Sequence, residues 1–351
     1  MTTELAHGFD PVLMRYLPGL LCSEVKPNSI YSKTDYISLL VKASILNGYA
    51  EGTSNVSRKL GKAPTSDTVL SYFKTMDRYE LLSASSIVFE EQVNLLRRMG
   101  MLNRPIQIAF DWHDQLFYGE KDSEMVNGIR SKNGSSYAYQ YLTASMLVDG
   151  RRLTVVLTPI KSREHMLAYI DDALNRIRNM GVRVRYLLFD AGFTSIVLPH
   201  YLQRHGYTYA MRFSSNSVTK RIGLKDGEEA LYPCDDPFRI LRTDDLRAGK
   251  SYLFATNMAC RPKTVLKRYK RRWGIETSYR EHNVFLAKTT SKDYTVRLLY
   301  YAVAVCIYDA WCVFNTRQGT HMIALEVKIS VLLLEFLTPL HSNDSKVDDY
   351  G

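Results

Sequence analysis

The sequence predicts an α/β protein in which a mixed sheet is flanked by helices. Three observations support this class. Residues 1–100 have apolar residues at helical spacing, residues 105–213 alternate short apolar runs with amphipathic stretches, and residues 214–260 return to short strands and turns. The chain has 351 residues, more than most single cores hold, so we expect either one large domain with appendages or two domains.

Helical patterns fill the first hundred residues. The stretch "TDYISLLVKASILNGY" predicts a helix that stops at Asn47 and Gly48, and "LLSASSIVFEEQVNLLRRMGM" predicts another that ends near Gly100. Residues 54–76 predict two short helices around a turn from Gly61 to Pro64. This pair has the spacing of a DNA-binding helix-turn-helix, but any helix hairpin has the same pattern. We predict a helical region over 1–101, with DNA binding as its candidate role.

The apolar period changes at residue 105. The run "PIQIAF" predicts a strand that ends at Asp111, and residues 137–160 predict two strands joined at Asp149 and Gly150. A helix that stops at Gly181, a strand "VRVRYLLF" that ends at Asp190, a helix within 194–206 and a strand "YTYAMRF" follow. The first three strands predict a meander. The later strands return through helices, which implies parallel pairing through right-handed crossovers.

The last third of the chain returns to helices after an insertion. Residues 214–260 predict short strands with turns at "KDGEE" and "CDDP". A long helix is expected from about Lys263 to Glu281, and two more helices reach about residue 337. We therefore predict an α/β domain over 102–290 with a β-rich insertion at 214–260, C-terminal helices over 291–341 and a flexible tail over 342–351.

Composition favours a reduced compartment and no membrane span. The beginning "MTTELAHGFD" shows no signal-peptide pattern. The five cysteines form no CxxC pair, which favours free thiols over a disulfide or zinc framework. Residues 298–314, "LLYYAVAVCIYDAWCVF", are short for a bilayer span and contain Asp309, so they favour a buried helix.

The positive charge is concentrated in one segment. The net charge is +10, and residues 261–280 contain eight basic residues and one acid, Glu276. Such a run is typical of a surface that binds a phosphate backbone, and also of a solvated helix face. Glu276 is accordingly either a partner that neutralises its basic neighbours or the acid to which those neighbours bring a polyanion.

Two aspartates predict a carboxylate pair. Asp111 and Asp190 each follow an apolar strand, and the first and fourth predicted strands can lie side by side, which would bring both side chains to one edge of the sheet. An aspartate at a strand end is also an ordinary turn residue. With Glu276 as a third carboxylate, the charges require a cation or a proton, because two like charges about 4 Å apart repel by roughly 4 kcal/mol at an effective dielectric of about 20.

These acids favour hard divalent metal ions. Carboxylate oxygens suit Mg²⁺ or Mn²⁺, and two such ions can promote an in-line phosphoryl displacement. Helical spacing places Tyr269, Arg272, Glu276 and Asn283 on one stripe, and Arg280 beside it.

Neighbouring residues have weaker patterns. Arg212 follows the fifth strand and either meets a phosphate or faces solvent. His113 and Asp114 either take part in metal binding or, as the favoured interpretation, are polar loop residues that do not contact the metal, and 120–136 is expected to be a mobile loop. Trp273 and Ile275 are expected to anchor the helix on the sheet rather than contact bases.

The order Asp111, Asp190 and Glu276, with "YKRRWGIETSYR" around the glutamate, resembles the DDE transposases of bacterial and archaeal insertion sequences. Their signature is tyrosine, two residues, arginine, three residues, glutamate, six residues and lysine, and this chain has Asn283 at the lysine position. The stretches "FDWHDQLFYG" and "FDAGF" are similar to the family's two aspartate motifs. The resemblance covers about 105–290. It implies a ribonuclease-H-like fold, with 214–260 as the insertion before the last catalytic helix.

The resemblance implies a DNA transposase that hydrolyses a phosphodiester at its element's ends and uses the freed 3′ hydroxyl for strand transfer. Asp111, Asp190 and Glu276 would hold Mg²⁺ or Mn²⁺, as two ions. The expected partners are double-stranded DNA, as terminal inverted repeats and as target, and a second copy of the chain on that DNA; the expected location is the cytoplasm, at the nucleoid. The candidate DNA contacts are Tyr269, Arg271, Arg272, Arg280 and Arg212. Two alternatives stay open: a decayed transposase that acts as a DNA-binding repressor, and a plain nuclease of the same fold.

Overall fold

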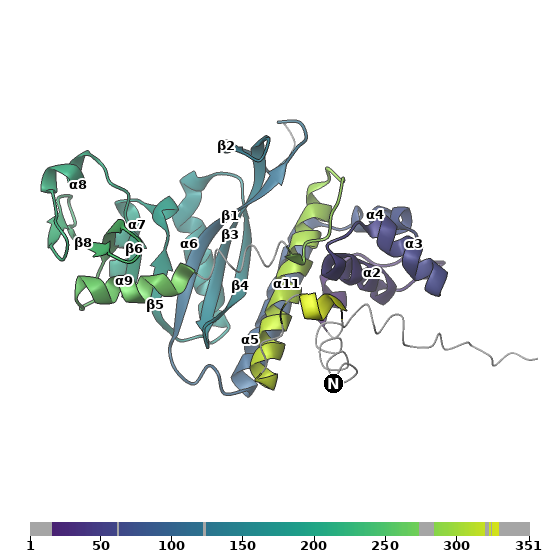
Figure 1. Cartoon of the computed structure of the whole chain (residues 1–351). Helices are drawn as coiled ribbons and strands as arrows, with labels where there is room; N and C mark the ends of the chain where they lie inside the picture. Colours follow the sequence, from purple (N-terminus) through teal and green to yellow (C-terminus); the bar gives the residue numbers. More distant parts are fainter. Residues whose placement is uncertain are drawn as a thin grey trace, which may run out of the picture. The chain divides into compact units, whose positions relative to one another are not determined.

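The structure is a computed structural model that describes residues 16–61, 63–121, 124–273, 284–319, 323 and 325–329 (Figure 1). The chain divides into two compact units, residues 1–84 with 281–351, and residues 85–280. The predicted boundaries at residues 101 and 290 stay predictions. The helix α5 (Arg78–Arg98) runs across the first division, and its predicted end near Gly100 is confirmed.

The first unit is helical. Its N-terminal elements are η1 (Leu17–Leu20), α2 (Lys33–Leu46), α3 (Ala50–Leu60) and α4 (Ser66–Phe73). A capping box formed by Ser32 and Asp35 begins α2, and Asn47 ends it in the left-handed conformation with φ 52°. The stop at Asn47 and the short helix pair on either side of the Gly61–Pro64 turn are therefore confirmed, whereas DNA binding by that pair stays a prediction.

The apolar helix near the C-terminus is α11 (Tyr294–Gln318), which packs on α2, α4 and η1. Asp293 caps it by accepting a hydrogen bond from the Val296 N–H, 3.0 Å away. Among the described residues, Tyr294–Thr316 alone is long and apolar enough to cross a membrane, and 94% of its most hydrophobic window is buried inside the protein. This burial agrees with the predicted core helix.

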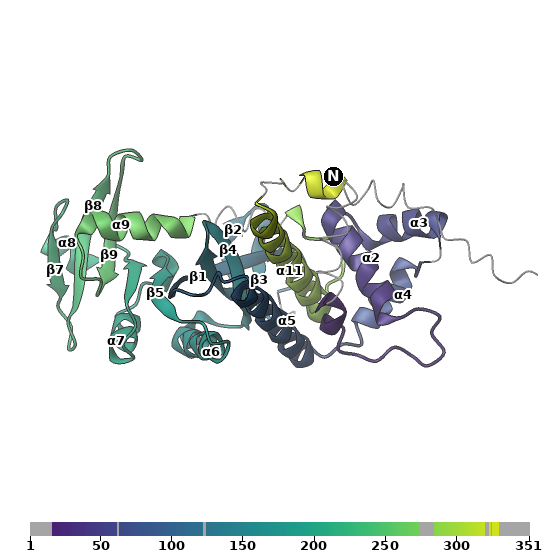
Figure 2. The same cartoon turned by 90° about the horizontal axis from the view of Figure 1, so that it is seen from below.

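The second unit is built on a sheet of nine described strands (Figure 2). The strands are β1 (Ile106–Phe117), β2 (Val126–Lys132), β3 (Ser135–Val148), β4 (Arg151–Ile160), β5 (Val184–Phe189), β6 (Tyr209–Arg212), β7 (Glu229–Tyr232), β8 (Phe238–Asp245) and β9 (Lys250–Thr256). Their order is β2-β3-β1-β5-β6-β9-β8-β7, and β4 also pairs with β3. The predicted meander is confirmed by the antiparallel pairs β1–β3 and β3–β4, and the crossovers by the parallel pairs β1–β5 and β5–β6. This is the mixed sheet that the sequence predicts.

Helices cover both faces of this sheet. Figure 2 shows α9 (Pro262–Lys270) on one face, and α6 (Met166–Asn179) and α7 (Val197–Arg204) on the other. The buried side of α9 packs on Ala109 of β1 and on Tyr186 and Leu188 of β5. Because strand residues alternate between faces, the odd-numbered residues of β1 face α9 and the even-numbered residues face away from it.

Three expectations about local structure are wrong. Strand β1 does not end at Asp111 but runs on to Phe117, because its second half stays paired with β3. Residues 120–136 are not simply a loop, because β2 and the start of β3 form a hairpin there with Asn133 and Gly134 at positive φ. The α-helix expected from about Lys263 to Glu281 is not continuous: α9 ends at Lys270 and the 3₁₀ turn η4 (Arg271–Trp273) follows, whereas residues 274–281 lie outside the described residues.

The insertion is β-rich as predicted and extends the sheet. It contains α8 (Ser217–Ile222) and β7 to β9, and β9 pairs antiparallel with β6. An ion pair between Lys270 and Asp245 joins the end of α9 to the end of β8. The insertion therefore provides part of the surface on which the helix leading to the predicted site rests.

Candidate active site

Asp111 lies at the centre of the sheet on the face that α9 covers. The parallel pairing of β1 with β5 ends at Phe110 and Phe189, so Asp111 and Asp190 are the next residues of two adjacent strands. The side chain of Asp111 is buried, at 7% exposed. Its Oδ1 accepts a hydrogen bond from the Trp112 backbone N–H at 2.9 Å. The predicted meeting of the two aspartate positions at adjacent strands is thus present in the fold.

Asp190 begins a short turn directly after β5. It is the N-cap of η3 (Ala191–Phe193), and its Oδ1 accepts a hydrogen bond from the Gly192 N–H at 2.9 Å. Burial raises the pKa of the Asp190 carboxyl above its ordinary value. The contributions that oppose this rise come from the Arg272 charge, the Gly192 N–H, and the charges of Arg163 and Arg212.

One buried arginine joins these acids to the helical segment. Nη1 of Arg272 in η4 lies 2.9 Å from Oδ2 of Asp111, and both side chains are at most 10% exposed. Burial would lower the pKa of Arg272, but the Tyr269 hydroxyl, Asp111 and Asp190 raise it, so it stays a cation. A buried cation and two adjacent carboxylates therefore form one charged cluster.

Tyr269 holds the Arg272 side chain through a hydrogen bond. Its hydroxyl accepts a hydrogen bond from Nε of Arg272 at 3.2 Å, and its ring packs edge-on against Phe254. Burial raises the pKa of Tyr269 to about 12, so the phenol keeps its proton at neutral pH. The i, i+3 stripe predicted for Tyr269 and Arg272 is present. Both side chains are buried, so their direct contact with DNA would require this segment to rearrange; that role stays a prediction.

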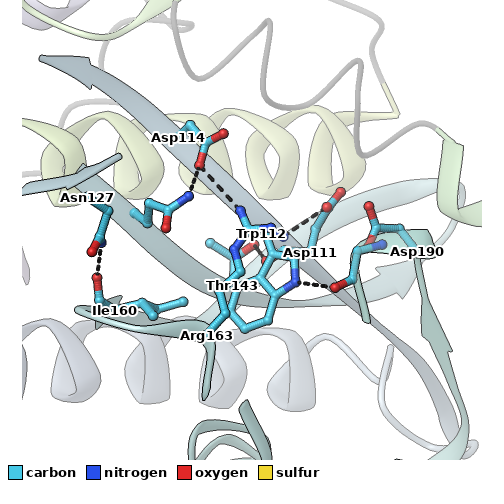
Figure 3. A network of polar contacts seen from close by, with 10 residues as sticks. Asp111, Trp112, Asp114, Asn127, Thr143, Ile160, Arg163 and Asp190 are labelled. Carbon is cyan, nitrogen blue, oxygen red and sulfur yellow. Dashed lines mark hydrogen bonds and ion pairs between the residues drawn. The ribbon is translucent and has the colours of Figure 1, made fainter. Parts of the chain in front are cut away.

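The other face of β1 holds a second polar network (Figure 3). Nε1 of Trp112 donates a hydrogen bond to the Gly192 carbonyl at 3.3 Å, and its ring stacks on Phe193 at 4.4 Å between centroids. The Arg163 guanidinium lies 5.1 Å from the centre of the indole and 3.6 Å from Oδ1 of Asp114. This network connects the segments that carry the two acids.

His113 and Asp114 lie on β1 rather than in a loop. Burial lowers the pKa of His113 to about 4, so its ring is neutral at neutral pH. Asp114 accepts a hydrogen bond from Nε2 of Gln140 at 2.6 Å and faces away from Asp111, because the two are three residues apart on a strand. Asp114 is therefore part of the sheet's polar network and does not join the carboxylate pair.

The remaining predicted residues have different positions. Arg212 ends β6, is exposed, and lies 5.5 Å over the ring of Tyr252. Arg271 is exposed and forms a side-chain hydrogen bond with Tyr186. Glu276, Arg280 and Asn283 lie outside the described residues, as do Gly274 and Ile275 and the side chain of Trp273. The position of the predicted third carboxylate, Glu276, therefore stays a prediction.

The donor chemistry of the pair suits a hard divalent cation. Asp111 and Asp190 each come directly after the last paired residues of the adjacent strands β1 and β5. Burial disfavours the charged form of Asp190. A divalent cation would favour that charged form, so these residues fit such an ion. In the part of the chain that the structure describes, no group of three or more His, Cys, Asp or Glu residues could hold a metal. The predicted triad would need its third acid from the segment beyond Trp273.

Comparison with known proteins identifies the family. The family model "Transposase DDE domain" matches residues 104–295, more than half of the chain. The chain belongs to this transposase family. It is therefore an enzyme of DNA cleavage and strand transfer, and its family generally uses divalent metal ions.

Comparisons with curated sequences and with solved structures add little to the assignment of this transposase. No curated protein sequence matches it. A solved structure, the crystal structure of the Mos1 strand transfer complex, is similar over 86% of this chain and 82% of its own, at 10% identity and a TM-score of 0.20. A TM-score this low does not transfer a fold, a ligand or an assembly.

Sequence reasoning did not identify Trp112, Gly192 and Arg163 as parts of the site. Trp112 directly follows Asp111 in "FDWHD", and Gly192 lies two residues after Asp190 in "FDAGF", so the signal was present in these two motifs. Arg163 lies in the short turn η2 (Arg163–His165) and had no local pattern that marked it.

Proposed function

We propose that Asp111 and Asp190, together with Glu276, hold the divalent metal ions of this insertion-sequence transposase. The observation that carries the proposal is the adjacency of Asp111 and Asp190 beyond the last paired residues of β1 and β5. When bound, two Mg²⁺ or Mn²⁺ ions supply Lewis-acid activation of the scissile phosphate and of the attacking oxygen. The Gly192 N–H and the Trp112 N–H each hold one carboxylate oxygen in place.

We further propose that Arg272 balances the charge of the acids in the metal-free protein. Its guanidinium pairs with Asp111 and also favours the charged form of Asp190. Without a cation at that position, the buried carboxylate of Asp111 and the partly buried one of Asp190 would repel, and one would tend to be protonated. Metal ions and Arg272 therefore compete for the charge of the same acids, and Arg272 would be released toward a substrate phosphate when metal is bound.

The DNA path is proposed from exposed cations near the site. Arg212, the last residue of β6, and Arg271, which directly follows α9, are both exposed. They, with Arg280 and the released Arg272, would hold the phosphates of double-stranded DNA at the element's terminal repeats and at the target. Tyr269 would contribute by orienting Arg272. A homodimer on paired ends, located at the nucleoid, completes the proposal.

The experiment that tests the proposal is a paired assay on Glu276→Gln. The change keeps the size of the side chain and removes a charge and a metal ligand. We expect nicking of end-containing DNA in Mg²⁺ to collapse, while binding of the same DNA in a chelator survives. If Glu276 only neutralises its basic neighbours, the change should cost little, because exposed pairs contribute about 0 to 1 kcal/mol.

Two matched outcomes separate the alternatives. Nicking by the Gln variant at the wild-type rate would overturn the assignment of Glu276. Wild-type protein that binds end DNA but neither nicks nor joins it in Mg²⁺ or Mn²⁺ would favour the decayed repressor, and nicking without strand transfer would favour the plain nuclease.

A further inference from the structure

The two acid positions are adjacent, but strand pairing between β1 and β5 stops just before them. The last paired residues are Phe110 and Phe189. Beyond this point β1 remains paired with β3, for example Asp111 with Thr143, whereas the chain after β5 turns away as η3. The spacing of Asp111 and Asp190 therefore depends on contacts other than the β1–β5 ladder.

Trp112 provides such contacts. Its indole Nε1 donates to the Gly192 carbonyl at 3.3 Å, and its ring stacks on Phe193 at 4.4 Å with an angle of 10° between the planes. The Trp112 side chain thus contacts both residues that follow Ala191 in the turn begun by Asp190.

Trp112 and Gly192 also orient the two carboxylates through their backbone N–H groups. The Trp112 N–H donates to Oδ1 of Asp111, and the Gly192 N–H donates to Oδ1 of Asp190, each at 2.9 Å. A displacement of this turn away from Trp112 would move the Gly192 N–H, and with it the direction of the Asp190 carboxylate, whereas the Trp112 N–H stays with β1, which is paired with β3 at this residue.

The contact between Trp112 and Gly192 leaves no room for a side chain at position 192. A Cβ atom there would lie 2.9 Å from Cδ1 of Trp112 and 3.1 Å from Oδ1 of Asp190. Either the indole or the carboxylate would have to shift. The glycine is therefore required by close approach, since its φ lies outside the left-handed region.

We propose that Trp112 is a positioning residue that clasps the two acid-bearing segments, so that the carboxylates of Asp111 and Asp190 keep the spacing and direction needed to share a divalent cation. The inference rests on the proposed function of these two acids as metal ligands. The indole holds the turn after Asp190 against the mutual repulsion of the carboxylates. It touches neither substrate nor metal, and acts through Gly192 and Phe193.

The competing explanation is that Trp112 only fills the core. An aromatic stack stabilises any core, so loss of Trp112 would lower stability without a specific effect on metal. A matched control exists in the insertion of the same unit, where Phe238 is 1% exposed and stacks on Tyr232 at 5.0 Å and 9°. Phe238→Leu removes a stacked aromatic ring that contacts neither acid-bearing segment.

The test is a Mn²⁺ titration of DNA-free protein, with free Mn²⁺ followed by electron paramagnetic resonance. The variants are Trp112→Leu, Trp112→Phe, Gly192→Ala and Phe238→Leu, each with its thermal midpoint measured in chelator. We expect Trp112→Leu and Gly192→Ala to weaken Mn²⁺ binding by about 10-fold or more, the usual effect of a residue that orients metal ligands. Trp112→Phe keeps the stack and loses the N–H donor, so about a 3-fold loss is expected.

The control fixes the interpretation. Phe238→Leu should lower the thermal midpoint and leave the Mn²⁺ affinity unchanged. Wild-type Mn²⁺ affinity in folded Trp112→Leu, or an equal loss of Mn²⁺ affinity in Phe238→Leu, would overturn the proposed positioning role of Trp112. If Trp112→Leu does not fold, Trp112→Phe and Gly192→Ala decide by the same readout, and wild-type affinity in both overturns the clasp.

The variants Asp111→Asn and Asp190→Asn test the proposed metal binding separately from the positioning role of Trp112. If these variants bind Mn²⁺ as the wild type does, the metal assignment itself fails. If they lose binding while the Trp112 and Gly192 variants keep it, the metal assignment holds and the clasp alone is wrong.

Discussion

The segment that ends α9 makes two ion pairs with buried aspartates, and the surroundings of the two pairs differ. Lys270 pairs with Asp245 of β8, and two residues later Arg272 pairs with Asp111 of β1. The two aspartates are similarly buried, at 6% and 7% exposed. At the sheet edge, Arg272 also acts on a second acid, Asp190, together with the charges of Arg163 and Arg212.

The pKa values of Asp245 and Asp190 shift in opposite directions in these two regions. The hydrogen bond from Lys270 is the main reason that the pKa of Asp245 is lowered. The pKa of Asp190 is raised, chiefly by burial, even with Arg272 nearby. The charged form is therefore favoured in the insertion and disfavoured at the sheet edge. A further cation has more to stabilise at the edge, which distinguishes a candidate metal site from a structural bridge.

The largest contrast is expected between Asp190→Asn and Asp245→Asn. Asp190→Asn should reduce nicking of end-containing DNA on the order of 10³-fold, because metal ions supply several kcal/mol of transition-state stabilisation. Asp245→Asn removes a comparably buried acid from a pair made by the same segment and should keep nicking within a few-fold of wild type. Rates of nicking in Mg²⁺ measure both, and similar losses in the two variants would contradict a functional difference between the pairs.

A second contrast concerns the cations. Arg272→Met leaves buried Asp111 without this partner, which should lower the free energy of unfolding by about 3 kcal/mol in chelator. Mn²⁺ should restore much of this loss, because it replaces the missing positive charge and binds only the folded site. Lys270→Met should lower stability less, and Mn²⁺ should not change that loss. Denaturant unfolding of both variants with and without Mn²⁺ measures the difference; equal responses to Mn²⁺ would count against a metal site at the edge.

Adjacent arginines sharpen the comparison for DNA. Arg271 is exposed and Arg272 is 4% exposed, so the two are expected to differ although they are neighbours. Arg271→Ala should reduce the log–log salt dependence of DNA affinity by about 0.9 if it contacts one phosphate. In chelator, Arg272→Ala should leave that slope nearly unchanged. Binding measured from low to moderate salt tests this, and the reverse order of effects would place Arg272 on the DNA already in the metal-free protein.

The smallest effect is expected in the acid stability of the insertion pair. Asp245 has a folded pKa below its unfolded value, so its stabilisation is present above the unfolded pKa and is lost as pH falls through the folded pKa. The difference in thermal midpoint between wild type and Lys270→Met should therefore be about 2 °C at pH 7 and shrink below about pH 4. A difference that is constant from pH 7 to pH 3 would show that the pair contributes through packing instead.

The sequence was sufficient for the meander, for the parallel return of the later strands, and for an arrangement in which Asp111 and Asp190 can meet. Apolar periodicity located β1 and β5, and parallel pairing through crossovers allowed these two strands to lie side by side, as they do in the structure. The continuation of β1 was missed because "DWHDQLF" alternates polar residues, and its pairing with β3 depends on residues about 20 to 32 positions away. The structure supplies that pairing.

Other features of the site have no sequence signal. The ion pair of Arg272 with Asp111 joins residues 161 positions apart, and basic spacing alone did not show that Arg272 is buried while Arg271 is exposed. The contact of Trp112 with Gly192 depends on the geometry of two segments, although each residue lies within two positions of a predicted acid. The third predicted carboxylate, Glu276, lies beyond the described part of the helical segment and stays a prediction.

The most direct test of the site is anomalous diffraction at the manganese edge from crystals of the protein soaked in Mn²⁺. We predict a manganese peak within bonding distance of both the Asp111 and Asp190 carboxylates, and an Arg272 guanidinium that has left Asp111. Crystals of Asp190→Asn should lose this peak, whereas crystals of Asp245→Asn should keep it. Absence of a peak at the two aspartates in wild-type crystals at saturating Mn²⁺, with the Arg272–Asp111 pair intact, would contradict the assignment of these acids as the metal site.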